Sequence, residues 1–502
     1  MSVADTSLAS VLPDRDRPGS LRQRVGAGLA LAAFVLLWLL PLSGLSPEAH
    51  RLAAVLGAVV VLWVSEALPL SATALLGAAL CVILGVAPAR EVFAPFADPL
   101  MFLFIGAFIL SRGIFVHHLD RRLAFAVLSL PWVGARPGRI LFALGAASAA
   151  LSGWISNTAT TAMMFGIGVS IIATMHATEG GRAMDPRFAS ALMLMIAFAA
   201  SIGGLATPVG TPPNVIGIGF IRSLLGEEIP FFQWALVGVP VVMVLFLFLY
   251  LFLRAAAPAG LAVLPGGVEM LRAERARLGP WTRGQRSVAV AFGVTVVLWV
   301  APGIVALAAG EGSASYQLLV RRMPEGVAAI LGALLLFVLP GDQGRAITWD
   351  EAVRIDWGVV LLYGGGFALG VLSFQTGLAD AIGRGFAGLL PLEGGFGLLV
   401  ASVLMAVLLS ETTSNTASAN MVVPVVISIA RAAGVDPLEP ALGATMAASL
   451  GFMLPVSTPC NAIVYGSGYI PLGRMIRWGL VLDLAGVVVI VCVVRALSHL
   501  LR

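Results

Sequence analysis

Charged residues are scarce in this 502-residue chain, and lysine does not occur in it at all. Only 11% of the residues are charged, all 30 basic residues are arginine, and 59% of the residues are hydrophobic. Soluble proteins carry about 25% charged residues, so this composition excludes an ordinary soluble domain. Many apolar stretches reach the ~20 residues that a helix needs to cross a bilayer. The composition therefore predicts an all-α, polytopic membrane protein.

Cysteine and histidine are also sparse, and their placement argues against an enzyme. The three cysteines, Cys81, Cys460 and Cys492, show neither a disulfide framework nor metal-ligand spacing. The five histidines fall in loops or at the ends of apolar segments, so none can activate a serine at membrane depth. We therefore expect no enzyme activity and no resident metal cluster, and the formal charge of +4 requires no nucleic-acid partner.

The arginines indicate how the chain is oriented in the membrane. Residues 1–24 lack the layout of a signal peptide and are expected to form a cytoplasmic tail. With that orientation twenty arginines face the cytoplasm and nine face outward, while Arg112 lies within a span. This matches the positive-inside rule, so we expect a multi-pass protein of the cell (inner) membrane. About eleven spans are expected, near 25–43, 51–68, 70–87, 98–116, 187–225, 232–253, 286–308, 325–340, 357–376, 440–470 and 475–497.

The chain divides into two halves joined by a charged connector. We expect a first half over 25–253, a cytoplasmic linker over 254–285 and a second half over 286–502. The linker is the longest break between apolar segments, and it contains the sequence VEMLRAERARL. Two readings of this sequence stay open, an amphipathic helix on the inner membrane surface or a simple connector.

Two polar motifs recur in the same order in the two halves. WISNTATT at 154–161 returns as TTSNTASA at 412–419, an offset of 258 (414 − 156). TPVGTPPNVIGIG at 207–219 returns as LPVSTPCNAIVYG at 454–466, an offset of 247 (454 − 207), with seven of thirteen positions identical. An odd number of spans separates the two SNT segments, so they would enter the membrane from opposite sides. The sequence therefore predicts an inverted repeat, which is common in secondary transporters.

The apolar flanks of each SNT motif are too short for a full span. We expect re-entrant hairpins at about 139–175 and 393–430 with SNT at their tips, and helices broken by proline and glycine at 187–225 and 440–470. Non-helical backbone at membrane depth is tolerated only inside protein or beside a wet cavity. Helix N-termini attract anions, while hydroxyl and carbonyl oxygens suit Na⁺. The four elements thus predict one site for an anion and cations. The alternative, SNT as hydrogen-bonding glue between helices, is disfavoured by the paired recurrence.

At these motifs the sequence resembles the divalent anion/sodium symporters, a family that carries dicarboxylates, citrate or sulfate. The resemblance covers about 25–497 and includes both SNT motifs and both TP motifs, VGTPPN and VSTPCN. It implies a homodimer with a scaffold domain and an elevator-type transport domain, importing C4-dicarboxylates such as succinate, fumarate or malate with sodium. By this likeness the substrate carboxylates would contact Ser156, Asn157, Thr158, Thr211, Ser414, Asn415, Thr416 and Thr458.

The same resemblance implies two sodium sites. One would involve Ser152, Ser156, Asn157 and Gly210, and the other Ser410, Thr413, Asn415 and Ser457, in part through backbone carbonyls. At least two sodium ions are expected, since a dianion in a cavity without arginine would otherwise face a large desolvation cost. The alternatives are a sodium-independent dicarboxylate or tricarboxylate exchanger, a sulfate carrier, an anion channel and a proton-driven carrier.

Two acidic residues lie in apolar surroundings, where an ionisable group is costly and suggests function. Glu411 immediately precedes TTSNT, and either binds a proton or cation or pairs with a polar neighbour and braces the hairpin. Gly153 stands at the matching position of the first half, so Glu411 is no symmetric ligand. Asp483 in the last span is read as structural or as close to an interface.

Overall fold

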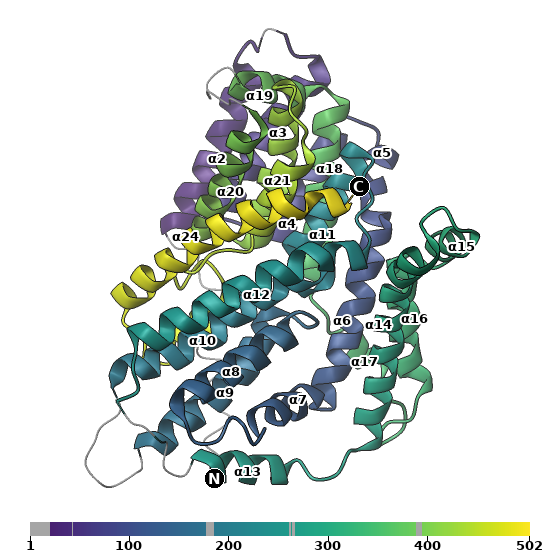
Figure 1. The fold of residues 1–502 in the computed structure, drawn as a ribbon. Coiled ribbons are helices and arrows are strands. Elements are labelled where there is room, and N and C mark those ends of the chain that lie inside the picture. The colour runs from purple at the N-terminus through teal and green to yellow at the C-terminus, as the bar shows by residue number, and fades with distance from the viewer. Residues whose placement is uncertain are drawn as a thin grey trace.

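In the computed structural model, the regular secondary structure of the described residues is helical, apart from one isolated β-bridge between Pro340 and Arg345 (Figure 1). The described residues are 21–42, 44–176, 185–260, 263, 267–387 and 394–501. Most of the predicted tail, residues 1–20, lies outside them. Ten of the described helices are long and apolar enough to cross a membrane, and α4, α8 and α16 are shorter apolar helices. The prediction of an all-α polytopic membrane protein is confirmed.

Each predicted span coincides with one helix, except for the two predicted broken spans. Residues 187–225 and 440–470 each contain two α-helices separated by a break. The helices up to the linker are α2 (Leu21–Leu39), α3 (Pro47–Ser65), α4 (Leu70–Ile83), α5 (Ala89–Phe93), α6 (Pro99–Val116), α7 (Leu119–Leu128), α8 (Pro137–Ser152), α9 (Asn157–His176), α10 (Pro186–Gly203), α11 (Pro212–Phe220) and α12 (Phe231–Ala256). Those that follow are α13 (Gly267–Arg277), α14 (Arg283–Ala309), α15 (Ala314–Arg322), α16 (Glu325–Val338), α17 (Trp349–Ala352), α18 (Trp357–Gln375), α19 (Leu378–Ala387), α20 (Gly394–Thr412), α21 (Asn415–Ala432), α22 (Leu438–Ala447), α23 (Pro459–Tyr465) and α24 (Leu472–Leu497).

Polar side chains mark where several of these helices begin. Ser46, Asp98, Asp185, Thr282 and Asp356 each accept a hydrogen bond from a backbone amide of the first turn that follows. The first amides of a helix have no partner within it, and a side-chain oxygen at this position satisfies one of them. The capping residues therefore fix helix starts that apolar composition alone leaves undefined.

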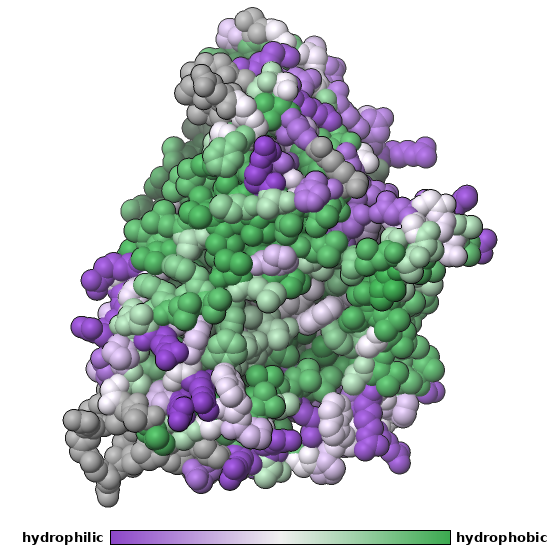
Figure 2. Space-filling view, in the orientation of Figure 1, coloured by the Kyte–Doolittle hydropathy of each residue, from purple (hydrophilic) through white to green (hydrophobic). Residues whose placement is uncertain are grey.

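The outer surface is apolar where a bilayer would contact it. Figure 2 shows hydrophobic side chains over α12, α24, α14 and α16, with hydrophilic residues gathered toward the ends of the molecule. Leu247 and Leu251 of α12, Leu307 of α14 and Val488 of α24 are among the exposed large hydrophobic residues. Such a surface would be unfavourable in water but matches lipid.

The helices around the two SNT motifs pack into one another across the halves. α10 lies wholly inside the molecule and packs against α8, α9, α12 and α23, while α22 packs against α20, α21, α24 and α11. α11 in turn packs against α21, and α23 against α9. The helix after each break therefore contacts the SNT segment of the other half. The succession of elements is the same in α8–α12 and α20–α24, and their inverted orientation in a membrane stays a prediction.

A glycine permits the closest approach near the first SNT motif. A Cβ on Gly203 would lie 2.2 Å from the carbonyl oxygen of Ala149, so no side chain fits where α10 ends against α8. Glycine is the residue that allows one backbone to approach another this closely. The contact sets the position of the break in α10 relative to the tip that follows α8.

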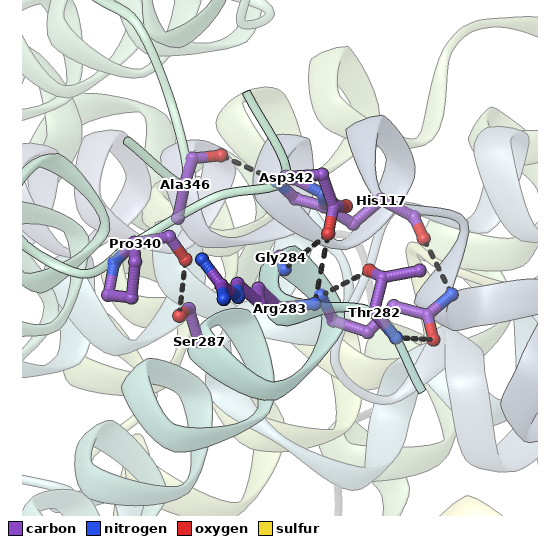
Figure 3. Close-up of polar contacts among 9 residues, drawn as sticks. His117, Thr282, Arg283, Gly284, Ser287, Pro340, Asp342 and Ala346 are labelled. Atoms are coloured by element: carbon purple, nitrogen blue, oxygen red, sulfur yellow. Dashed lines mark hydrogen bonds and ion pairs between the residues drawn. The ribbon is translucent and has the colours of Figure 1, made fainter. Parts of the chain in front are cut away.

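Away from the SNT motifs, a polar network ties together the ends of α6 and α14 (Figure 3). Asp342 Oδ1 accepts hydrogen bonds from the amides of Arg283 (2.9 Å) and Gly284 (3.3 Å) at the start of α14. His117, just after α6, lies 3.5 Å from Asp342 Oδ2, and its Nε2 lies 2.6 Å from the carbonyl oxygen of Ala346. The Asp342 carboxylate thus connects its own loop to the end of α6 and to the start of α14.

Candidate functional site

The first SNT motif forms a non-helical tip between α8 and α9. α8 ends at Ser152 and α9 begins at Asn157, and the Ser152 hydroxyl lies 2.6 Å from Asn157 Oδ1. The hydroxyl of Thr207, in the broken helix, donates to the carbonyl of Gly153 at 2.5 Å. The tip is therefore fixed both to itself and to the break in the neighbouring helix.

The side chain of Asn214 bridges the break after α10. Two short 3₁₀ turns separate Gly203 from Pro212, where α11 begins. Asn214 Nδ2 donates to the carbonyl oxygens of Gly204 at 2.9 Å and Thr207 at 2.8 Å. The break releases these carbonyls from the regular helix ladder, and a buried carbonyl without a partner is costly. Asn214 thus clamps the irregular backbone in place.

The second SNT motif forms an equivalent tip between α20 and α21. Ser410 Oγ lies 2.8 Å from both Asn415 Oδ1 and the carbonyl oxygen of Ala448. Asn415 Nδ2 donates to the carbonyl of Ser449 at 3.3 Å. Since a hydroxyl carries one hydrogen, Ser410 can satisfy only one of its two oxygen neighbours at a time.

The second break carries the same clamp as the first. Asn461 Nδ2 donates to the carbonyl oxygens of Gly451 and Leu454, both at 2.9 Å. These carbonyls lie ten and seven residues before the asparagine, the same separations as in the first half. The two breaks are therefore built alike in their hydrogen bonding as well as in their sequence.

The clamping asparagines are functional candidates that the sequence analysis did not assign. Asn214 and Asn461 were visible only as two of the seven identical motif positions. A stronger signal was present, because the chain contains five asparagines, of which Asn157, Asn214, Asn415 and Asn461 lie at these tips and breaks and Asn420 lies within α21, which follows the second tip. Asn214 and Asn461 are fully buried, and within the described part of the chain neither Oδ1 has a hydrogen-bond partner. Each break thus retains an acceptor oxygen.

Oxygen atoms converge at the side-chain amide of Asn157. The end of this amide that is assigned as oxygen lies 2.6 Å from Ser152 Oγ, 3.2 Å from the carbonyl oxygen of Gly210 and 3.3 Å from that of Ala200. With the amide turned, its NH₂ group lies within donating distance of all three and satisfies them without an ion. With the oxygen turned inward instead, four oxygens share one hydrogen, and a cation could take the place of the missing hydrogens. Three of the four residues implied for the first sodium site, Ser152, Asn157 and Gly210, meet here.

The other residues implied for the site gather around the same tips and breaks but differ in exposure. Ser156 is exposed, and Asn157, Thr158, Ser414 and Asn415 are partly exposed. The remaining ones are buried, namely Ser152, Thr211, Thr416, Thr458, Gly210, Ser410, Thr413 and Ser457. Thr413 Oγ1 lies 2.9 Å from Ser418 Oγ rather than from another implied sodium ligand.

The first tip and the second break meet directly. Cys460, in the first turn of α23, lies against Thr158 and Thr161 of α9 and Ser201 of α10. Thr458, two residues earlier, accepts from the amide of Asn461 at 3.1 Å and so caps α23. The residues implied for substrate binding in one half are therefore close to the broken helix of the other.

Glu411 connects the second tip to the second break. Its Oε1 accepts from the amide of Met453 and its Oε2 from the hydroxyl of Ser457, each at 2.8 Å. The residue is 3% exposed. These contacts correspond to the bracing interpretation of Glu411, and they place its carboxylate beside a residue implied for the second sodium site.

Two solved transporter structures share the overall fold. They are the YdaH transporter of Alcanivorax borkumensis (TM-score 0.53, 14% identity, 94% of this chain and 96% of that one) and MtrF of Neisseria gonorrhoeae (TM-score 0.53, 14% identity, 92% and 96%). At this identity the likeness concerns the fold alone.

Sequence relatives are considerably closer. A protein named sodium-dependent dicarboxylate transporter SdcS from Staphylococcus saprophyticus is 34% identical over 442 residues, covering 86% of this chain and 83% of that protein. SdcS of Staphylococcus aureus (strain bovine RF122 / ET3-1) is 33% identical over 443 residues, covering 86% and 82%. The family model described as the sodium:sulfate symporter transmembrane region matches residues 22–501. The resemblance inferred from the motifs is confirmed: this chain belongs to the sodium:sulfate symporter family of multi-pass membrane transport proteins, and it is not an enzyme.

Proposed function

We propose that this protein imports C4-dicarboxylates such as succinate, fumarate or malate across the cell membrane, coupled to sodium. Family membership supports transport, and the relatives named as sodium-dependent dicarboxylate transporters support both the substrate class and the ion. The proposal includes a cytoplasmic N-terminus, which the distribution of arginine supports. Relatives of the same architecture include sulfate carriers by family name, so the choice of substrate needs its own argument.

The observation that carries the proposal is the convergence of oxygens at the two tips. Ser152, Asn157 and Gly210 face one another in the first half. Ser410 faces Asn415 and Ala448 in the second. In the second group the oxygens outnumber the hydrogens available to join them, and in the first group they do so when the Asn157 amide oxygen faces Ser152 and Gly210. A small hard cation resolves such a contact without requiring an acidic ligand, so each group suits one sodium ion.

The substrate is proposed to bind between the tips through its two carboxylates. α9 begins at Asn157 and α21 at Asn415, so the first amides of both helices point toward the tips and attract anions. Ser156, Thr158, Ser414 and the implied threonines add hydroxyl donors, and Asn157 and Asn415 add amide donors. Two equivalent helix N-termini match two carboxylates, which favours a dicarboxylate over sulfate.

Sodium is proposed to supply the positive charge that this site otherwise lacks. A dianion brings two negative charges, while each helix N-terminus contributes only about half a positive charge. Two helix ends therefore leave about one negative charge uncompensated, and no arginine lies within the SNT or TP motifs. One sodium ion per half reverses the balance. Sodium is therefore expected to bind first and to raise the affinity for the substrate.

Transport is proposed to follow an elevator-type alternating-access cycle in a homodimer. α8–α12 and α20–α24, which interlock through α10, α11, α22 and α23, would form the moving domain. The other spans would form the scaffold. The ion pair between Asp98, at the start of α6, and Arg222, which follows α11, joins the two groups of helices and would have to break or rearrange when they move.

The decisive experiment is succinate binding to the purified protein with sodium replaced by choline at constant ionic strength. We expect sodium to raise succinate affinity, and succinate to raise sodium affinity by the same factor, because linkage is reciprocal. Unchanged succinate affinity would rule out sodium symport and favour exchange of one anion for another. Sodium-driven uptake into proteoliposomes, with a sodium-free control, separates this carrier from a channel or a proton-driven carrier.

A further inference from the structure

Two buried acidic side chains face each other beside the second tip. Glu411 belongs to α20 and Asp483 to α24, which packs against both α20 and α22. Each residue is 3% exposed, and their carboxyl groups lie at hydrogen-bond range of one another. Two ionised carboxylates at this range repel strongly in a low-dielectric interior, so the pair requires a positive charge or a proton.

Asp483 has no protein group to neutralise it. Within the described part of the chain, neither of its oxygens has a hydrogen-bond partner and neither carboxylate takes part in a salt bridge. The amide of Phe452 faces Asp483 but does not meet hydrogen-bond geometry. Buried polar groups without partners are rare and generally mark a ligand, an ion or water. Asp483 is such a group, and it points toward Glu411.

Glu411, by contrast, already has hydrogen-bond partners. The amide of Met453 donates to its Oε1 and the hydroxyl of Ser457 to its Oε2. Among the described residues, the unpartnered oxygens of the pair are therefore those of Asp483.

The feature is confined to the second half of the chain. Gly153 stands where Glu411 would have its counterpart, and α12, which follows the first broken helix as α24 follows the second, contains no acidic residue. A ligand held by this pair would have no symmetric partner. It would be additional to one ion per half.

We propose that a sodium ion binds between the carboxylates of Glu411 and Asp483, as a third sodium site in each protomer. This inference rests on the proposed sodium coupling and extends it. Carboxylate oxygens are hard ligands that suit a small cation, and Ser457 links Glu411 to the second of the two sodium sites already proposed. Sodium ions in these two neighbouring sites balance the two carboxylates. Three sodium ions with a dianionic substrate then carry one net positive charge inward in each cycle.

The test is the number of sodium ions bound by each protomer. We would measure saturation binding of radioactive sodium to the purified full-length protein, without substrate, at fixed pH and with choline to hold ionic strength constant. We expect three ions for the wild type and two for Asp483→Asn, which keeps the side-chain shape and removes the charge. Glu411→Gln provides a second variant with the same expectation, and Asp350→Asn, an exposed residue of α17, is the matched control with three.

The outcomes separate this site from the transport proposal. Loss of one ion in both variants, with succinate binding still sodium-dependent, supports the third site. An unchanged count in Asp483→Asn overturns it and leaves the pair sharing a proton, as does a wild-type count of two. A wild type that binds no sodium overturns the coupling proposal itself. In proteoliposomes, Asp483→Asn should also lose the inward current that accompanies succinate uptake.

Discussion

Asn214 and Asn461 make the same two hydrogen bonds in the two halves of the chain. Each donates to the carbonyls ten and seven residues before it, and so spans the break in its own helix. The bonded segments contain or adjoin Gly210 and Ser457, which are implied for the two sodium sites. We therefore expect the asparagines to position backbone oxygens for the proposed ions without touching the ions themselves.

Replacing either clamp should weaken sodium binding more than substrate recognition. Asn214→Ala or Asn461→Ala removes two buried hydrogen bonds, each contributing about 1 kcal/mol, so we expect sodium affinity to fall by about tenfold or more. Sodium dependence of uptake at saturating succinate measures this effect. Gln375→Ala, at an exposed position, is the control. An equal loss of sodium and succinate affinity would indicate general destabilisation.

The tip asparagines should be indispensable for transport. Asn157→Ala and Asn415→Ala each remove an amide that faces both the proposed ion and the proposed substrate, so we expect uptake to be abolished while expression is retained. Initial rates of succinate uptake in proteoliposomes provide the measurement. Ser467→Ala, just beyond the second motif, should have a milder effect because its hydroxyl bonds only locally, to Val464 and Tyr469. Near-normal uptake by either tip variant would favour the alternative in which SNT only joins neighbouring helices by hydrogen bonds.

Substrate preference should follow the two-tip arrangement. Sulfate offers one compact anionic centre, whereas succinate offers two carboxylates that can each meet a helix N-terminus. We therefore expect unlabelled succinate, fumarate and malate to compete with labelled succinate far better than sulfate does at equal concentration. Full competition by sulfate would contradict the proposed C4 preference.

The network at Asp342 predicts a pH-dependent contribution to stability. Burial raises the pKa of Asp342, but hydrogen bonds from Thr282, Gly284 and Arg283, together with His117, lower it below its ordinary value overall. A lowered pKa means that the stabilisation is complete above the ordinary pKa of aspartate and is lost as pH falls through the lowered value. Asp342→Ala should therefore cost about 1 kcal/mol at neutral pH, as for a lost helix cap. Thermal unfolding in detergent should show this difference shrinking in acid, and a constant difference would refute it.

The sequence was informative wherever polar residues interrupt apolar runs. Proline, glycine and SNT mark the tips and breaks because few other patterns place such residues at membrane depth, and the helices end and restart there. The short helices α7 and α19 were not predicted, since ten residues of mixed polarity after a span resemble a loop. The contacts of Glu411 with Met453 and Ser457 could not be predicted either. They depend on packing between segments more than 40 residues apart, which local patterns do not specify.

The interlocked tips and breaks imply that neither half is a self-sufficient folding unit. α11 packs on α21 and α23 on α9, so a separated half would expose polar, broken helices that its partner normally covers. A chain cut within the 254–285 connector should therefore recover succinate uptake only when both pieces are produced together. Each piece alone should be degraded. The duplicated halves have therefore diverged into complementary parts. Two copies of the same half would not replace the native pair.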